Sequence, residues 1–140
     1  MRIVLDTNII ISGLFWGGVP GKILDDGLKN KKYVFCFSNE TFDELRDVLL
    51  FPKFQSQIQK LNFTVEDFLI ELSELSLIFL TSPQENIIKN HPDDDKFITC
   101  AVASSAQYLI SGDQHLLKLK EFQNIPILTP RQFLNRISKK

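Results

Sequence analysis

Residues 2–8 read Arg-Ile-Val-Leu-Asp-Thr-Asn, and they join an apolar strand to a polar end. Residues 3–5 form a short unbroken apolar run, which is typical of a strand buried on both faces. A second apolar run begins at Ile9, directly after the acid, the hydroxyl and the amide. In an open α/β sheet, ligands bind beyond the carboxyl ends of the strands. Asp6 is therefore either a carboxylate of such a site or the N-cap of the next helix, and this stretch alone leaves both open.

The composition indicates an ordinary globular protein. The chain has 140 residues, of which 44% are hydrophobic and 24% charged, so we expect one domain over residues 1–140 and no disorder. A formal net charge of −1 argues against a strongly basic protein that coats nucleic acid, but it permits a local basic rim. Cys36 and Cys100 have no partners at metal-binding spacing, which favours two buried thiols in a reducing compartment.

The sequence also argues against a membrane protein. No apolar run approaches the roughly eighteen residues of a membrane span. The N-terminus does not have the pattern of a signal peptide, because Asp6 interrupts its apolar run. We therefore expect a cytoplasmic protein without a membrane partner.

Apolar runs and helical patterns alternate along the chain. The expected strands cover residues 3–5, 33–37, 77–80, 108–111 and 125–128, the last at a sheet edge because it contains Pro126. The expected helical segments cover residues 9–15, 20–29, 38–50, 54–63, 64–75, 93–106 and 115–119, followed by a C-terminal helix from residue 129. Residues 16–21 and 90–92 are expected to be loops. This alternation predicts an α/β fold with a parallel sheet of four or five strands and helices on both faces.

One acid of the helix expected at residues 93–106 lies on the apolar side. At 100° per residue, the apolar stripe consists of Phe97, Ile98, Ala101 and Val102. Asp94 falls in the middle of this stripe, and Asp93 and Asp95 fall at its two edges. The helix dipole favours an acid in the first turn whichever way it points, so the dipole does not explain this direction. An acid on the inner side needs a metal ion or a basic partner.

Two further acids take similar positions. Glu44 borders the apolar stripe of the helix at residues 38–50, whereas Asp43 and Asp47 lie on the opposite side, so we favour a functional role for Glu44 over a surface charge. Asp113 follows the strand at residues 108–111 after Gly112, which allows a tight turn over the strand end. Asp113 is also a good N-cap for the next short helix, and the two roles are compatible.

Four acids thus lie at a strand end or in the first turns of the helix beyond it: Asp6, Glu44, Asp94 and Asp113. In a parallel sheet these places meet at one edge. Four ionised carboxylates cannot gather without a compensating charge, and hard oxygen ligands suit Mg²⁺ or Mn²⁺. Such an ion can activate water and neutralise charge on a phosphodiester. This chemistry requires no nucleophilic side chain, and none is apparent.

Several pieces of the sequence, in this order and at these spacings, resemble a known family. They are residues 4–8, Ser38 with residues 44–45, residues 93–97 with Ala101, residues 108–113 with residues 116–117, and residues 127–134. Together they resemble the PIN-domain family, and in particular the VapC-like toxin ribonucleases of bacterial type II toxin–antitoxin pairs. The resemblance spans nearly all of the chain. No single piece is specific, but the first four in order at these spacings are.

The resemblance implies a three-layer α/β/α fold and a metal-dependent endoribonuclease that uses Mg²⁺ or Mn²⁺. The family's catalytic and metal-binding acids fall on Asp6, Glu44, Asp94 and Asp113, and its supporting polar positions fall on Asn8 and Ser111. Among the three consecutive aspartates we choose Asp94, because it is aligned with Ala101 as in the family pattern. The resemblance also implies an RNA substrate, a cognate antitoxin protein and a homodimer. Candidate RNA contacts are Lys29, Lys31, Lys32, Lys96 and Arg131.

Three other functions are compatible with acids above a parallel sheet. An aspartyl-phosphate hydrolase would have a second aspartate two residues after the first, where this chain has Asn8. A response-regulator receiver would have an early acid pair and a lysine after the last strand, where this chain has residues 129–131, Thr-Pro-Arg. The third is a PIN fold that serves as a non-catalytic RNA- or protein-binding module. The complete set of four acids argues against such a module.

Overall fold

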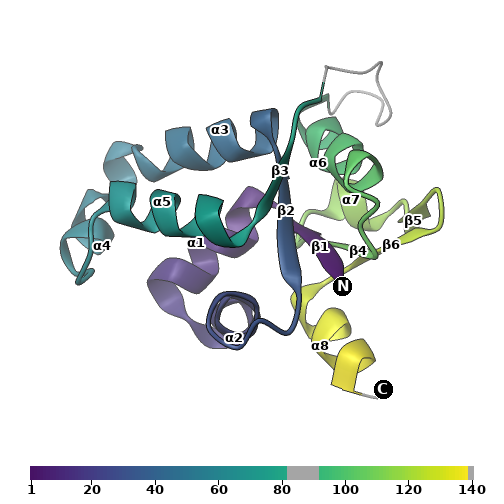
Figure 1. The fold of residues 1–140 in the computed structure, drawn as a ribbon, viewed down its shortest axis with the longest axis horizontal. Helices are drawn as coiled ribbons and strands as arrows, with labels where there is room; N and C mark the ends of the chain where they lie inside the picture. The colour runs from purple at the N-terminus through teal and green to yellow at the C-terminus, as the bar shows by residue number, and fades with distance from the viewer. Residues whose placement is uncertain (82–91, 139–140) are drawn as a thin grey trace.

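A mostly parallel β-sheet forms the centre of the molecule (Figure 1). The computed structural model describes residues 1–81 and 92–138, and for residues 92–94 the backbone alone. Within these ranges the strands are β1 (Arg2–Leu5), β2 (Val34–Ser38), β3 (Leu77–Phe79), β4 (Tyr108–Ile110), β5 (Glu121–Phe122) and β6 (Ile125–Leu128). Their order is β3-β2-β1-β4-β6-β5, and only the β5–β6 pairing is antiparallel. The predicted α/β fold with a central, mainly parallel sheet is confirmed.

Helices cover both faces of this sheet. The helical elements of the described ranges are α1 (Thr7–Trp16), α2 (Gly18–Leu28), α3 (Asn39–Leu49), the 3₁₀ turn η1 (Pro52–Phe54), α4 (Gln55–Gln59), α5 (Val65–Leu75), α6 (Pro92–Ala103), α7 (Gln114–Leu117) and α8 (Pro130–Ser138). One core cluster joins α1, α2, α3, α5 and α8 to one face, and a second joins α6 and α7 to the other. None of these helices has the length and hydropathy of a membrane span.

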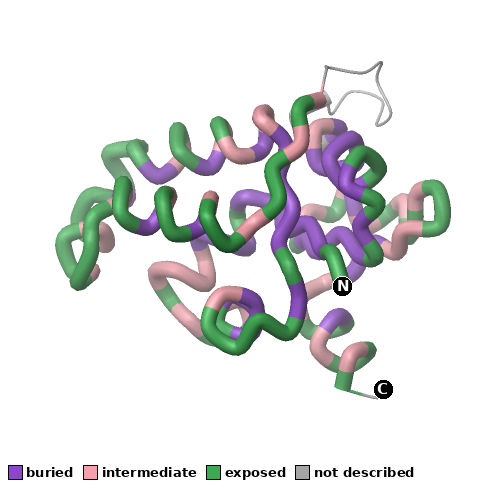
Figure 2. Tube along the Cα trace, in the orientation of Figure 1, coloured by how far each residue is buried: buried purple, intermediate pink, exposed green. Residues whose placement is uncertain are grey.

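Alternate residues of β1 belong to the two different cores. Ile3 and Leu5 lie in the core of the first face, and Val4 lies in the core of the second. All three side chains are at most 2% exposed, so the predicted strand with two buried faces is confirmed. Figure 2 shows the same distribution, with buried residues along β1 and β2 and exposed residues on the outer sides of α3 and α5. The sheet is thus the middle one of three layers.

The C-terminal edge of the sheet differs from the prediction. The sheet has six described strands instead of four or five, because β5 forms a short hairpin with β6. Gln123 and Asn124, which connect these strands, both have positive φ angles of 47° and 67°, as a tight primed hairpin turn requires. The prediction that residues 125–128 form an edge strand was wrong, since β6 lies between β4 and β5. Pro126 is tolerated there because the parallel pairing with β4 begins only at Ile127.

Two predicted helix boundaries were also wrong. The loop predicted at residues 16–21 is reduced to Gly17, because positive φ angles at Gly17 and Gly18 turn the chain directly from α1 into α2. The helix predicted to reach residue 106 ends at Ala103, where Ser105 adopts a left-handed conformation with φ of 54°. The backbone N–H of Ala106 then donates to the carbonyl of Ala101 at 2.9 Å, which closes the helix end without a glycine.

Val102 is more exposed than its predicted place on the apolar stripe suggests. Val102, expected on the apolar stripe of α6, is 36% exposed. It lies in the last turn of the helix, next to a surface hollow shared with residues 105–108. Residues 90 and 91 of the predicted turn lie outside the described residues.

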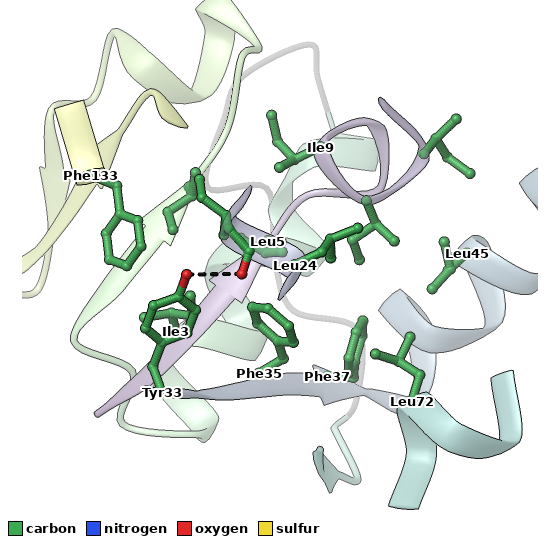
Figure 3. Close-up of a cluster of buried hydrophobic side chains, with 14 of the residues drawn as sticks. Ile3, Leu5, Ile9, Leu24, Tyr33, Phe35, Phe37, Leu45, Leu72 and Phe133 are labelled. Atoms are coloured by element: carbon green, nitrogen blue, oxygen red, sulfur yellow. Dashed lines mark hydrogen bonds between the residues drawn. The ribbon is translucent and has the colours of Figure 1, made fainter. Parts of the chain in front are cut away.

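Helix α2 lies unusually close to the sheet at Gly27. A Cβ atom at this position would lie 2.5 Å from Cζ of Phe35, a ring that is 2% exposed in the core shown in Figure 3. Tyr33 fixes the same region, since its hydroxyl donates to the carbonyl of Ile23 at 2.8 Å. The absence of a side chain at Gly27 is therefore what allows α2 to reach β2.

We predict that Gly27→Ala destabilises the protein by about 1–3 kcal/mol, because the new methyl group overpacks the core against Phe35. The measurement is the free energy of unfolding in guanidinium chloride. Gly21→Ala is the matched control on the same helix. Its Cβ would meet nothing closer than the carbonyl oxygen of Gly13 at 3.4 Å, so the higher helix propensity of alanine leaves stability unchanged or raised. Equal losses in both variants would contradict the close approach at Gly27.

Candidate active site

Asp6 lies at the carboxyl end of β1, where that strand borders β4. Its backbone N–H donates to the carbonyl of Ile110 at 3.0 Å, which extends the β1–β4 pairing by one residue. Its side chain also caps α1, since Oδ1 accepts a hydrogen bond from the backbone N–H of Ile9 at 3.0 Å. The N-cap interpretation of Asp6 is thus confirmed. It uses one carboxylate oxygen and leaves the ligand interpretation open.

Ser111 connects Asp6 to Asp113. The Ser111 hydroxyl, which is fully buried, donates to Oδ2 of Asp6 and accepts a hydrogen bond from the backbone N–H of Asp113 at 2.9 Å. Asp113 caps α7, since its Oδ1 accepts from the backbone N–H of His115 at 2.7 Å. Asp6 and Asp113 thus lie together at the ends of β1 and β4, where the sequence placed both acids, and Ser111 connects them.

The Asp6 carboxyl is in an environment that disfavours its charged form. Only 5% of the residue is exposed. Burial raises the pKa of Asp6 above its ordinary value, and the charge of Asp113 adds to this rise. Hydrogen bonds from Ser111 and from the backbone of Ile9 and Gly112 oppose the rise without cancelling it.

Asp26 shows what a compensated buried acid looks like in the same molecule. It is 4% exposed, and its carboxylate lies 3.3 Å from Nζ of Lys22 and 3.7 Å from Nζ of Lys32. Burial raises the pKa of Asp26, but a hydrogen bond from Asn30 and the two lysines outweigh burial, so its pKa is lower than usual. Asp26 thus has two lysines beside its carboxylate and a lowered pKa, whereas Asp6 has a neighbouring acid, Asp113, and a raised pKa. The charge of Asp6 is therefore one that a bound cation would stabilise.

Glu44 is held from two sides. Thr7, the residue after Asp6, donates its hydroxyl to Oε2 of Glu44. Nζ of Lys96 lies 3.0 Å from Oε1 of the same carboxylate. The predicted position of Glu44 at the border of the buried face of α3 is confirmed, since its side chain is 26% exposed next to the buried Leu45.

These residues line a small cleft of about 140 Å³ at the carboxyl ends of β1 and β4. Its walls are Asp6, Thr7, Asn8, Glu44, Val48, Phe97 and Asp113. A water molecule occupies about 30 Å³ in the liquid, so the cleft has room for a few water molecules or a partly hydrated ion. A larger hollow of about 670 Å³ lies between α2 and α5, away from these carboxylates. The chemistry thus points to the smaller cleft.

The predicted site residues can now be located. The cleft gathers Asp6, Asn8, Glu44 and Asp113, and Ser111 contacts Asp6 from below the surface. Asp94 lies in α6, but its side chain, like that of Asp93, lies outside the described residues. Asp95 is 6% exposed, so an acid that the helix pattern placed at the edge of the stripe is in fact buried.

The bond of Thr7 to Glu44 was not predicted from the sequence, and Lys96 was predicted only as a candidate RNA contact. Both residues are bonded to Glu44. Thr7 follows Asp6 directly, and its 6% exposure follows from its place in the first turn of α1. Lys96 carries no comparable signal, because a lysine off the apolar stripe is usually a solvated charge.

The donor chemistry of the cleft fits Mg²⁺ or Mn²⁺, since the polar side chains at its walls offer oxygen ligands. Among the side chains that the structure describes, no three of the His, Cys, Asp or Glu type are arranged to hold a metal ion. Mg²⁺ is usually bound through one or two carboxylates and retains several waters, which the neighbouring Asp6 and Asp113 can satisfy. The residues present therefore fit such an ion.

Comparison with known proteins gives one match. The family model of the PIN domain matches residues 2–115, from the first residue of β1 into α7. This segment contains Asp6, Glu44, Asp94 and Asp113. No curated protein matches the chain.

We predict that Asp6→Asn raises the melting temperature of the metal-free protein at pH 7 by about 2–8 °C. The pKa of Asp6 is higher in the folded state than its ordinary value of 3.8, so the folded protein binds the extra proton between these two values. Its stability therefore falls as the pH rises through that range, and asparagine, which can still cap α1, removes this loss.

The measurement is a series of thermal melts in EDTA from pH 3 upward, in which the advantage of Asp6→Asn shrinks as the pH falls towards 3.8. Asp47→Asn on α3, whose side chain is 69% exposed, is the control and should follow the wild type. A lower melting temperature for Asp6→Asn at every pH would mean that its hydrogen bonds outweigh its buried charge.

Proposed function

Because the chain belongs to the PIN-domain family, we propose that it is a metal-dependent endoribonuclease that hydrolyses RNA phosphodiester bonds. PIN domains are in general nucleases and typically use divalent metals. The observation that carries the proposal is the Asp6 carboxyl, which is buried beside Asp113 at the end of the sheet. Within the described ranges no lysine is paired with it, whereas Lys22 and Lys32 are paired with Asp26. A nuclease of this kind needs such a charge, since it must hold a cation.

In the proposed mechanism, Asp6 and Asp113 hold Mg²⁺ or Mn²⁺ from the ends of two adjacent strands. A divalent ion in this place supplies the means to activate water and to neutralise charge on the phosphodiester. Ser111 and the backbone of Ile9 fix both oxygens of Asp6, so the carboxylate is oriented before an ion arrives. Burial of Asp6 lowers the local polarity and strengthens its attraction for a cation.

Two further acids complete the proposed site. Glu44 faces the same cleft from α3, and Asp94 in the first turn of α6 contributes a fourth carboxylate. Asn8 lines the cleft with an amide that can orient a water molecule or a carboxylate.

The finer assignments rest on the resemblance of residues 4–8, 93–97 and 108–113 to the VapC-like group. We propose on this basis that the protein is the toxin of a toxin–antitoxin pair. In this proposal it acts in the cytoplasm as a homodimer on RNA, and a cognate antitoxin protein is its partner.

We predict that the protein cleaves RNA with Mg²⁺ or Mn²⁺ but not with EDTA. Asp6→Asn and Asp94→Asn should each reduce the cleavage rate about a hundredfold or more, because each removes a charge that holds the ion. The measurement uses a panel of single- and double-stranded RNAs with each metal and each variant.

Asp47→Asn provides the control, since it removes a charge of α3 whose side chain is 69% exposed and which does not line the cleft. Cleavage that needs metal but survives Asp94→Asn would assign the fourth acid to Asp93 or Asp95. Metal-dependent cleavage that survives Asp6→Asn would contradict the proposed site. A chain that cleaves no RNA of the panel yet retains RNA or protein partners would instead be a non-catalytic module.

A further inference from the structure

The ion pair between Glu44 and Lys96 joins the two helices on either side of the cleft. Nζ of Lys96 in α6 lies 3.0 Å from Oε1 of Glu44 in α3, 52 residues apart in the sequence. The side chains are only 21% and 26% exposed. By contrast, the pair Arg46–Asp43 lies within α3 and the pair Lys29–Asp25 lies at the end of α2. The side chains of both pairs are at least half exposed, as is common for surface charges.

Both oxygens of Glu44 have a donor, and the two donors differ in charge. Thr7 supplies a neutral hydroxyl to Oε2, and Lys96 supplies an ammonium group to Oε1. Glu44 is also a wall of the cleft that contains Asp6 and Asp113. The ammonium group of Lys96 is therefore a positive charge bonded to the rim of an acidic cleft.

We propose that Lys96 is a positioning residue that acts as the internal counter-cation of the cleft, holding Glu44 in place and competing with the divalent metal for its carboxylate. This inference rests on the proposed function, since it assumes that the cleft binds a metal ion. It goes beyond that function, because it assigns to Lys96 an effect on the affinity of the cleft for the metal ion.

The electrostatics give the direction of this competition. A divalent ion close to Glu44 and the ammonium group of Lys96 repel each other, so each weakens the binding of the other to the carboxylate. Such a coupling between two cations is reciprocal. Thr7 carries no charge and can remain bonded to Oε2 in both states. Lys96 thus stabilises the metal-free protein at the cost of metal affinity.

Lysine suits this role better than arginine would. Its ammonium group is a compact charge on a flexible four-carbon chain, so it can leave one carboxylate oxygen without disturbing the helix. An arginine would bind the same carboxylate through a rigid planar fork. The charge, however, is the same in both, which makes arginine a useful substitution.

The test is to titrate Mn²⁺ into wild-type protein, Lys96→Met and Lys96→Arg by calorimetry, with no RNA present. We expect Lys96→Met to bind Mn²⁺ about tenfold more tightly, because the variant lacks the ammonium group that repels the divalent ion. Its melting temperature in EDTA should be lower than that of the wild type, and its rise on adding Mn²⁺ should be larger. Lys96→Arg, which keeps the charge, should stay near the wild-type affinity.

Arg46→Met is the matched control. It removes one positive charge and one ion pair from α3, the helix that carries Glu44, but from an exposed pair with Asp43. Its Mn²⁺ affinity should equal that of the wild type.

Each other outcome overturns the inference in a distinct way. Weaker Mn²⁺ binding in Lys96→Met would mean that Lys96 only supports the site, and unchanged binding would mean that Glu44 lies outside the metal's influence. In both cases the proposed nuclease would stand. Failure of the wild-type protein itself to bind Mn²⁺ would instead overturn the proposed function together with this inference.

Discussion

The carboxylate of Asp6 joins three elements at one point. The backbone N–H of Asp6 donates to the carbonyl of Ile110 in β4. One carboxylate oxygen caps α1, and the other accepts a hydrogen bond from the hydroxyl of Ser111, directly after β4. These bonds set the position of the first helix relative to the two central strands. They also hold a carboxyl group in a place from which water is largely excluded. The same residue therefore organises the fold locally and places a buried carboxyl where the proposed cation would bind.

At the cleft, burial of the Asp6 carboxyl opposes its charged form. Asp26, a buried acid of α2, has two lysines beside it and a lowered pKa. Asp6 has hydrogen bonds that orient it, and the neighbouring Asp113 raises its pKa further. Only Glu44 among the described acids of the cleft is paired with a lysine. Among the described residues, the acids at the strand ends thus have fewer basic partners than Asp26 has, as the proposed cation site requires.

Much of this could be predicted from the sequence, because the decisive patterns are local. The apolar run before Asp6, the tight turn at Gly112 and the helical pattern around Glu44 placed three acids at one edge of the sheet. The β5–β6 hairpin was not predicted, because Gln123 adopts a positive φ angle and glutamine is not a residue that favours one. The end of α6 was missed for the same reason at Ser105. The Lys96–Glu44 pair was not predicted, because it depends on how α3 and α6 pack against each other. The pattern of residues within one helix does not give this packing.

The hydrogen bond between Ser111 and Asp6 spans 105 residues of sequence. The central pairing of β1 with β4 spans nearly the same separation, so neither can form until most of the chain is present. A nascent or truncated chain that ends before β4 would contain Asp6 and Glu44 but would lack Ser111 and Asp113. The topology therefore delays formation of the acidic cleft until β4 is present. A chain that ends before β4 cannot form this cleft.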